Sequence, residues 1–139
     1  MIEKFQGETR WLSNFAPVKI VMNGLTFPTT EHAYMAAKSD NPIWKVKCTE
    51  ENITPGQIKR LSKEVQLVDN WETKKVEVMK ECVRQKFSQN PYKKMLKDTG
   101  NQHIQEGNNW GDLFWGVDLK SGKGENILGK LIMDFRNTL

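Results

Sequence analysis

The feature that most constrains the fold is the pair Asn23-Gly24, which lies between two short apolar segments. Asn-Gly is the pair that best fits a type I′ turn, because both central residues of that turn need a positive φ. The sequence therefore predicts an antiparallel hairpin with strands at residues 18–22 and 25–27. Pro28 follows the second strand, so the hairpin leads directly into the next element.

The segment after the hairpin, residues 31–38 with the sequence EHAYMAAK, is predicted to be a helix. Thr29 or Thr30 can cap its first turn, and its alanines favour helix. At about 100° per residue, one face carries an acid, a phenol, a thioether and an amine: Glu31, Tyr34, Met35 and Lys38. We expect this face to hold the chemistry. A solvated face with ordinary packing is the plainer interpretation, since two turns is long for a direct ion pair.

The composition is that of a globular, mildly basic chain. It has 139 residues, 37% hydrophobic and 27% charged, with a formal net charge of +4. This length predicts one domain, residues 1–139. The charge suits phosphate-bearing ligands or nucleic acid, but no basic run marks a nucleic-acid tail. No apolar stretch reaches the roughly 20 residues of a membrane span, and the first residues lack a signal-peptide pattern, so we expect a cytoplasmic protein without membrane association.

Cysteine and histidine give no indication of a metal site. Cys48 and Cys82 are far apart, which favours free thiols in a reducing compartment. His32 and His103 are also far apart, which argues against zinc. We therefore expect no metal.

The rest of the chain mixes helices with short strands. Helices are predicted at residues 55–63, 69–88, 92–97 and 127–137, and short strands at residues 3–7, 103–106 and 112–119, while residues 43–52 are ambiguous. The longest helix has a core face made of Trp71, Met79, Cys82, Val83 and Phe87. Because strands and helices do not alternate regularly, the fold class is α+β, a predominantly helical single domain with a small antiparallel sheet.

Two further segments carry candidate functional residues. The loop at residues 121–126, SGKGEN, places glycines before a helix that Asn126 can cap, with Lys123 nearby, as in a phosphate-binding loop. It lacks Walker A and dinucleotide spacing, so a plain loop with a good cap is the alternative. Asp112 could serve in acid–base chemistry if it is buried, and Trp115 could stack on a base. An exposed carboxylate and a structural tryptophan are the commoner outcomes.

Several motifs follow one another along nearly the whole chain. They are LSNF (residues 12–15), EHAYMAAK (31–38), Trp71, TGNQHIQE (99–106), DLFWG (112–116), and GKGENILGKLIM (122–133) with Arg136. This ordered set resembles the NADAR superfamily, which includes the YbiA-like N-glycosidases. Met35 stands where many relatives have glutamine, and Ile104 where leucine is frequent. Neither departure removes a reactive group.

The resemblance implies a YbiA-like fold that cleaves a ribosyl–nitrogen bond without a cofactor. It implies two substrate classes, phosphoribosylamino-pyrimidine intermediates of riboflavin synthesis and ADP-ribose attached to guanine in nucleic acid. Its partner would thus be a phosphorylated ribosyl small molecule or an ADP-ribosylated nucleic acid. The expected catalytic residues are Lys38, Glu31 and Asp112. With the helix-face and loop patterns added, the expected substrate contacts are Asn14, Tyr34, Trp115, Lys123 and Asn126.

The protonation state of Lys38 decides how it acts. A nucleophilic amine must be neutral; burial would lower its pKa from about 10.4, whereas a neighbouring Glu31 would raise it. Lys38 either forms an imine with the opened ribose or stays charged and holds a phosphate, and a carboxylate could instead stabilise an oxocarbenium-like centre while water attacks. We favour the imine. A non-catalytic ADP-ribose or nucleotide-binding module on the same fold is the alternative function.

We also expect Glu31, Tyr34 and Lys38 to face one pocket that is bordered by Asp112 and the loop at residues 121–126.

Overall fold

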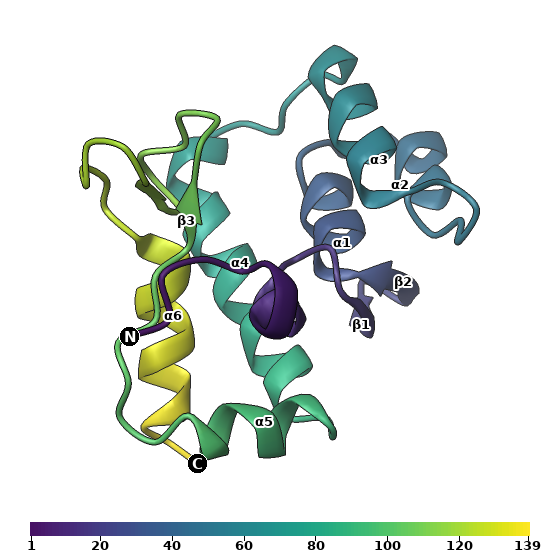
Figure 1. The fold of residues 1–139 in the computed structure, drawn as a ribbon. Coiled ribbons are helices and arrows are strands. Elements are labelled where there is room, and N and C mark those ends of the chain that lie inside the picture. Colours follow the sequence, from purple (N-terminus) through teal and green to yellow (C-terminus); the bar gives the residue numbers. More distant parts are fainter. The chain divides into compact units, whose positions relative to one another are not determined.

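The computed structural model describes all 139 residues, which form two compact units (Figure 1). Residues 14–86 form what we call the hairpin unit, and residues 1–13 with 87–139 form the terminal unit. The helices are η1 (Gly7–Leu12), α1 (Thr30–Ala37), α2 (Pro42–Lys47), α3 (Pro55–Leu61), η2 (Ser62–Glu64), α4 (Trp71–Phe87), α5 (Tyr92–Asp98) and α6 (Ile127–Arg136), and the strands are β1 (Pro17–Met22), β2 (Leu25–Thr29), β3 (Gly107–Asn108) and β4 (Val117–Asp118). The predicted α+β class with dominant helices is confirmed. The single domain stays a prediction.

The hairpin of the first unit is confirmed. Strands β1 and β2 pair antiparallel, and Asn23 and Gly24 both have positive φ, 51° and 78°, as the predicted turn requires. Ile20 lies opposite Phe27, and both side chains are buried. The hairpin therefore buries one face and leads its second strand straight into α1.

Helix α1 begins at Thr30 and ends at Ala37, as predicted within a residue. Helices α2 and α3 lie beside it (Figure 1). The ambiguous segment is resolved as α2, because Asn41 caps it and Pro42 occupies its first turn. The predicted core face of α4 is confirmed, since all five of its side chains are buried: Trp71, Met79, Cys82, Val83 and Phe87.

The terminal unit differs from the prediction at its short strands. Residues 3–7 form no strand; Ile2 instead makes a single parallel bridge to Ile104. The segment at residues 103–106 does not extend the hairpin sheet. Its role is to pair with the N-terminus, through hydrogen bonds from the Ile2 amide to the His103 carbonyl and from the Gln105 amide to the Ile2 carbonyl, 2.8 and 2.9 Å.

The predicted strand at residues 112–119 is also wrong for most of its length. Only β4 is a strand there, and it pairs in parallel with β3. The first half is a turn, because the Asp112 carboxylate accepts the backbone N–H groups of Phe114 and Trp115, which a strand would need for pairing. Gly116 ends the turn where a Cβ would collide with the Glu106 carbonyl group, so only glycine fits.

No helix of the chain combines the length and the apolar character needed to cross a bilayer.

Helix α4 carries a deeply buried lysine. The Lys86 side chain is 2% exposed, and burial lowers its pKa from 10.5 to about 7. An unfolded chain would hold the proton up to its ordinary pKa, so between these two values the unfolded state binds more protons than the folded state. The free energy of unfolding must therefore rise with pH across that window.

We expect this rise to disappear when Lys86 is replaced by methionine. Between about pH 7 and 10 the wild-type free energy of unfolding should increase by up to about 1.4 kcal/mol per pH unit, while Lys86→Met stays flatter. Urea unfolding at several pH values measures both. Lys80→Met, an exposed position on the same helix, should keep the wild-type slope. Parallel pH profiles for wild type and Lys86→Met would contradict the assignment of this rise to Lys86.

Candidate active site

The start of α1 is fixed by Thr29 and His32. The Thr29 hydroxyl accepts the His32 backbone N–H at 3.1 Å and lies 2.7 Å from Nδ1 of the same ring. The other ring nitrogen, Nε2, lies 2.7 Å from the Ile53 carbonyl, which can only accept, so Nε2 carries the proton. Burial lowers the His32 pKa, which keeps the ring neutral. His32 thus ties α1 to the loop before α3.

Glu31 is held in the first turn of α1. Its backbone N–H donates to the Asn14 carbonyl at 3.0 Å, and its side chain is buried. The Asn14 amide in turn contacts the Met79 sulfur on α4 at 3.7 Å. The structure therefore brings two predicted site residues, Asn14 and Glu31, to the same place.

Lys38 caps the other end of α1 and is half-buried. Its Nζ lies 3.4 Å from the Ser62 hydroxyl and 5.9 Å from the centre of the Tyr34 ring. That ring packs on Trp71 at 5.2 Å between centroids. The Lys38 carbonyl accepts the Val68 N–H at 2.8 Å, so backbone and side chain are both positioned.

The electrostatics around Lys38 lower the pKa of its amine. Burial is the largest effect and lowers its pKa, the Glu31 carboxylate raises it, and three further ammonium groups lower it: Lys59, Lys63 and Lys75. The net direction is downward. A lysine whose pKa is lowered by burial and neighbouring cations is a typical activated nucleophile.

Neither cysteine competes for this role. Both are free and buried, and burial raises the pKa of each thiol to about 12. Since the thiolate is the nucleophile, both are inert near neutral pH.

The hairpin unit thus gathers four of the predicted site residues: Asn14, Glu31, Tyr34 and Lys38. The other four belong to the terminal unit: Asp112, Trp115, Lys123 and Asn126. The expected shared pocket stays a prediction.

Asp112 organises its own turn. One carboxylate oxygen accepts the N–H groups of Phe114 and Trp115 at 3.0 and 2.9 Å, and the Asn108 side chain binds both backbone groups of Asp112. The Trp115 ring meets Phe114 edge-on at 4.9 Å. These contacts give the turn a fixed shape, and catalysis by Asp112 stays a prediction.

Asn126 occupies the N-cap position of α6, as predicted, but its side chain does not cap the helix. Asn126 is in the left-handed region, φ 53° and ψ 40°, and makes no side-chain cap bond. Its buried amide instead donates to the Ile104 carbonyl and accepts the Glu106 N–H, both at 3.0 Å. The side chain is used to join the start of α6 to the segment that precedes β3.

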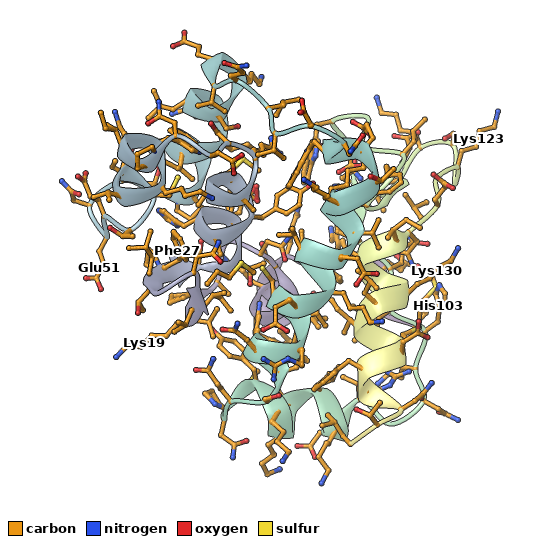
Figure 2. All side chains as sticks on the ribbon, turned by 180° about the vertical axis from the view of Figure 1, so that it is seen from behind. Lys19, Phe27, Glu51, His103, Lys123 and Lys130 are labelled. Atoms are coloured by element: carbon orange, nitrogen blue, oxygen red, sulfur yellow. The ribbon has the colours of Figure 1, made fainter.

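The open helix N-terminus expected for phosphate binding is also absent. The amides of Glu125, Asn126, Ile127 and Leu128 donate to the four carbonyls of residues 113–116, at 2.8 to 3.2 Å. A phosphate needs such amides free, so this argument for an anion site does not hold. Lys123 projects outward from the loop as an exposed side chain (Figure 2).

Sequence reasoning missed Ser62 as a partner of Lys38. The two residues are separated by 24 positions, and no local pattern marks a buried serine after a helix as a site residue. It also missed an open pocket of about 610 Å³, which lies on a face of α3 other than the one near Lys38. The pocket is lined by Lys47, Asn52, Ile53, Gln57, Arg60, Leu61 and Glu64, none of which was a predicted site residue.

Comparison with known proteins identifies the family. The family model described as NADAR domain matches residues 3–139, and the chain belongs to this family. The solved structure of YbiA from Escherichia coli superimposes with a TM-score of 0.83 at 28% identity, covering 99% of this chain and 86% of that one. The predicted YbiA-like fold is thereby confirmed.

Curated relatives carry two kinds of name. "N-glycosidase YbiA" of Escherichia coli K12 is 33% identical over 130 residues, which cover 91% of this chain and 79% of that protein. Riboflavin biosynthesis proteins of Vibrio vulnificus and Zea mays are 37% and 35% identical over 93% and 91% of this chain. The chain spans only 35% and 23% of the length of these two proteins.

Replacing Asn126 should destabilise the protein. Asn126→Ala removes two hydrogen bonds and puts alanine at a positive φ, so we expect the free energy of unfolding to fall by about 2–4 kcal/mol. Asn126→Gly relieves the backbone strain only and should lose less. Denaturant unfolding measures both, with Asn137→Ala at the exposed end of α6 as the control. An unchanged unfolding midpoint for Asn126→Ala would contradict this account.

Removing the Glu31 charge should lower the Lys38 pKa further. Glu31→Gln keeps the side-chain shape but deletes the one charge that raises this pKa. NMR titration of lysine labelled at Cε measures the value directly. Glu77→Gln, an exposed carboxylate on α4, serves as the control and should leave the Lys38 pKa unchanged. A Lys38 pKa that stays constant or rises in Glu31→Gln would show that Glu31 does not act on the amine.

Proposed function

We propose that this chain is an N-glycosidase that hydrolyses a ribosyl–nitrogen bond with Lys38 as nucleophile. The observation that carries the proposal is the half-buried Lys38 amine, whose pKa is lowered although the buried Glu31 carboxylate is near. The family supports the same reaction, since relatives that match over most of this chain are named N-glycosidases.

The substrate we propose is a phosphorylated ribosylamino-pyrimidine of riboflavin synthesis. The names of the Vibrio vulnificus and Zea mays relatives support this class. ADP-ribose on guanine remains the second class to test, because it contains the same type of bond. Both are attacked at the same carbon, C1 of the ribose.

The reaction begins with the neutral amine of Lys38. Its lone pair attacks C1, the C1–N bond breaks, and the departing base keeps the bonding electrons and takes up a proton. The ring oxygen then leaves C1 with a proton, which gives an open-chain protonated imine between Lys38 and the sugar. Water adds to C1, and collapse of the adduct releases the free sugar and restores the amine. One water is consumed per bond cleaved.

Glu31 is proposed to move the protons. Its position in the first turn of α1 puts it close enough to raise the Lys38 pKa. A carboxyl group there can take the proton that Lys38 loses and deliver it to the departing base. Ser62 contributes by holding Nζ, and the Tyr34 ring covers one side of the amine.

Borohydride trapping tests the mechanism. Incubation with substrate and borohydride should reduce the imine and add the sugar mass to the wild-type protein at Lys38. Lys38→Arg keeps the charge but stays protonated, so it should show neither adduct nor turnover, a loss of at least about 10³-fold. Lys45→Arg, which alters another half-buried lysine that contacts α1, should keep both.

The outcomes separate the alternatives. Turnover by the wild type without a trapped adduct would favour direct attack by water. Substantial turnover by Lys38→Arg would reduce Lys38 to an electrostatic anchor. Binding of ADP-ribose without release of any free base from either substrate class would identify a non-catalytic binding module instead.

A further inference from the structure

The open pocket beside α3 is a second candidate binding site. It has a volume of about 610 Å³ and lies entirely within the hairpin unit. One wall is a single face of α3 and η2, formed at spacings of three and four residues by Gln57, Arg60, Leu61 and Glu64. Ser62, the partner of Lys38, lies roughly 140° round the helix from Gln57. The pocket is therefore separate from the reactive lysine.

The rest of the lining is held in place by hydrogen bonds. It comes from the end of α2 and the loop that joins α2 to α3 (Figure 1), and consists of Lys47, Asn52 and Ile53. The Ile53 carbonyl accepts the Nε2–H of His32 at 2.7 Å, and its N–H donates to the Glu50 carbonyl at 3.3 Å. The side-chain oxygen of Gln57 accepts the Thr54 N–H at 2.8 Å, which leaves the amide nitrogen of Gln57 as a donor for a ligand.

The pocket carries charges of both signs that do not pair with each other. Arg60 and Glu64 have the i,i+4 spacing at which opposite charges often meet, yet neither they nor Lys47 form an ion pair. The Arg60 side chain folds back over the first turn of α3, where its Nη1 lies 3.8 Å from the position that a Cβ on Gly56 would take. Glu64 is eight residues beyond Gly56, or about 12 Å along a helix. The guanidinium and the carboxylate are thus directed to different parts of the pocket.

This lining suits a ligand with an anion at one end and an amino group at the other. Arginine and lysine bind phosphate oxygens through charge-assisted hydrogen bonds, and a carboxylate accepts from the exocyclic amino group of a nucleobase. The amides of Asn52 and Gln57 can bind hydroxyls or a base edge, and Ile53 and Leu61 supply apolar surface for a ring. The volume is that of a site for a ligand larger than a single amino acid or a bare phosphate.

We propose that this pocket binds a nucleoside monophosphate whose base carries an exocyclic amino group. Arg60 and Lys47 bind the phosphate, and the amino group donates to Glu64. The base packs on Ile53 and Leu61. In an extended nucleotide, the phosphate and the amino group are separated by a length comparable to two helical turns, which matches the spread of the charges along α3. The proposal does not depend on the reaction at Lys38.

The experiment compares nucleotides that differ in the group facing Glu64. Adenosine monophosphate carries an amino group where inosine monophosphate carries a carbonyl oxygen, and the cytidine and uridine monophosphates form a second such pair. We expect calorimetry on the intact chain to show about tenfold tighter binding of the amino-bearing member of each pair, because a carbonyl oxygen is repelled by the carboxylate. Adenosine without phosphate should bind more weakly than its monophosphate.

Variants of the lining assign each contact. Arg60→Gln and Lys47→Gln should each weaken adenosine monophosphate binding about tenfold and leave adenosine binding unchanged. Glu64→Gln should remove the preference for the amino-bearing nucleotides, since an amide can bind either group. All three positions are exposed, so the fold should be retained.

Two matched variants control for general charge. Lys63→Gln removes an exposed cation next to Glu64, and Glu51→Gln removes an exposed carboxylate next to Asn52. Neither residue lines the pocket, so both variants should bind nucleotides like the wild type. If Lys63→Gln loses as much affinity as Arg60→Gln, the nucleotide is attracted by overall charge and the pocket is overturned as its site.

Other outcomes would also overturn the proposal. Nucleotide binding that none of the three lining variants weakens would show that the ligand binds elsewhere, including at the site beside Lys38. No binding in the millimolar range, or equal affinity within each nucleotide pair, would exclude the proposed ligand class. Hydrolysis of an N-glycoside by a protein with either result would leave the glycosidase intact, since the two sites lie on different faces of α3.

Discussion

The hydrogen bonds of Thr29 and His32 join the end of β2, the start of α1 and the loop before α3. Thr29 is the last residue of β2 and the cap of α1 at once, so no flexible connector separates strand from helix. The His32 ring continues the chain of hydrogen bonds to the Ile53 carbonyl. This junction sets where α1 begins and in which direction it runs. It thereby also positions Lys38 at the far end of the helix.

Local signals predicted the elements that depend on neighbours in sequence. The turn at Asn23-Gly24 needs only its own two residues, and α1 needs only a cap and helix-forming side chains. Asn126 shows why other elements were missed. As an isolated residue before an apolar helix it predicts a cap, but its partners, Ile104 and Glu106, lie 22 and 20 residues away. No pattern near Asn126 indicates them.

The candidate site, too, could be predicted only where it depends on residues that are neighbours in the sequence. Helical periodicity placed Glu31, Tyr34 and Lys38 on one face. From that placement, burial was expected to lower the Lys38 pKa and the Glu31 carboxylate to raise it. Periodicity could not settle the net direction of the Lys38 pKa shift, because burial, the largest effect, depends on tertiary packing and the neighbouring cations come from other elements. Lys59 and Lys63 flank Ser62 at the end of α3, and Lys75 lies on α4, all far from α1 in sequence. The balance of charge at an amine is a property of the tertiary fold, and only the fold reveals it.

Helix α3 has a consequence for how such proteins diverge. It is a seven-residue helix with its own capping box, so its stability owes little to which side chains occupy its outer positions. One side contributes a charge that acts on Lys38, and another lines a separate pocket. Mutations in this one short segment would change the surroundings of Lys38 or the lining of the pocket while α1 stays untouched. Descendants of a common ancestor could thereby acquire new substrates without rebuilding their chemistry.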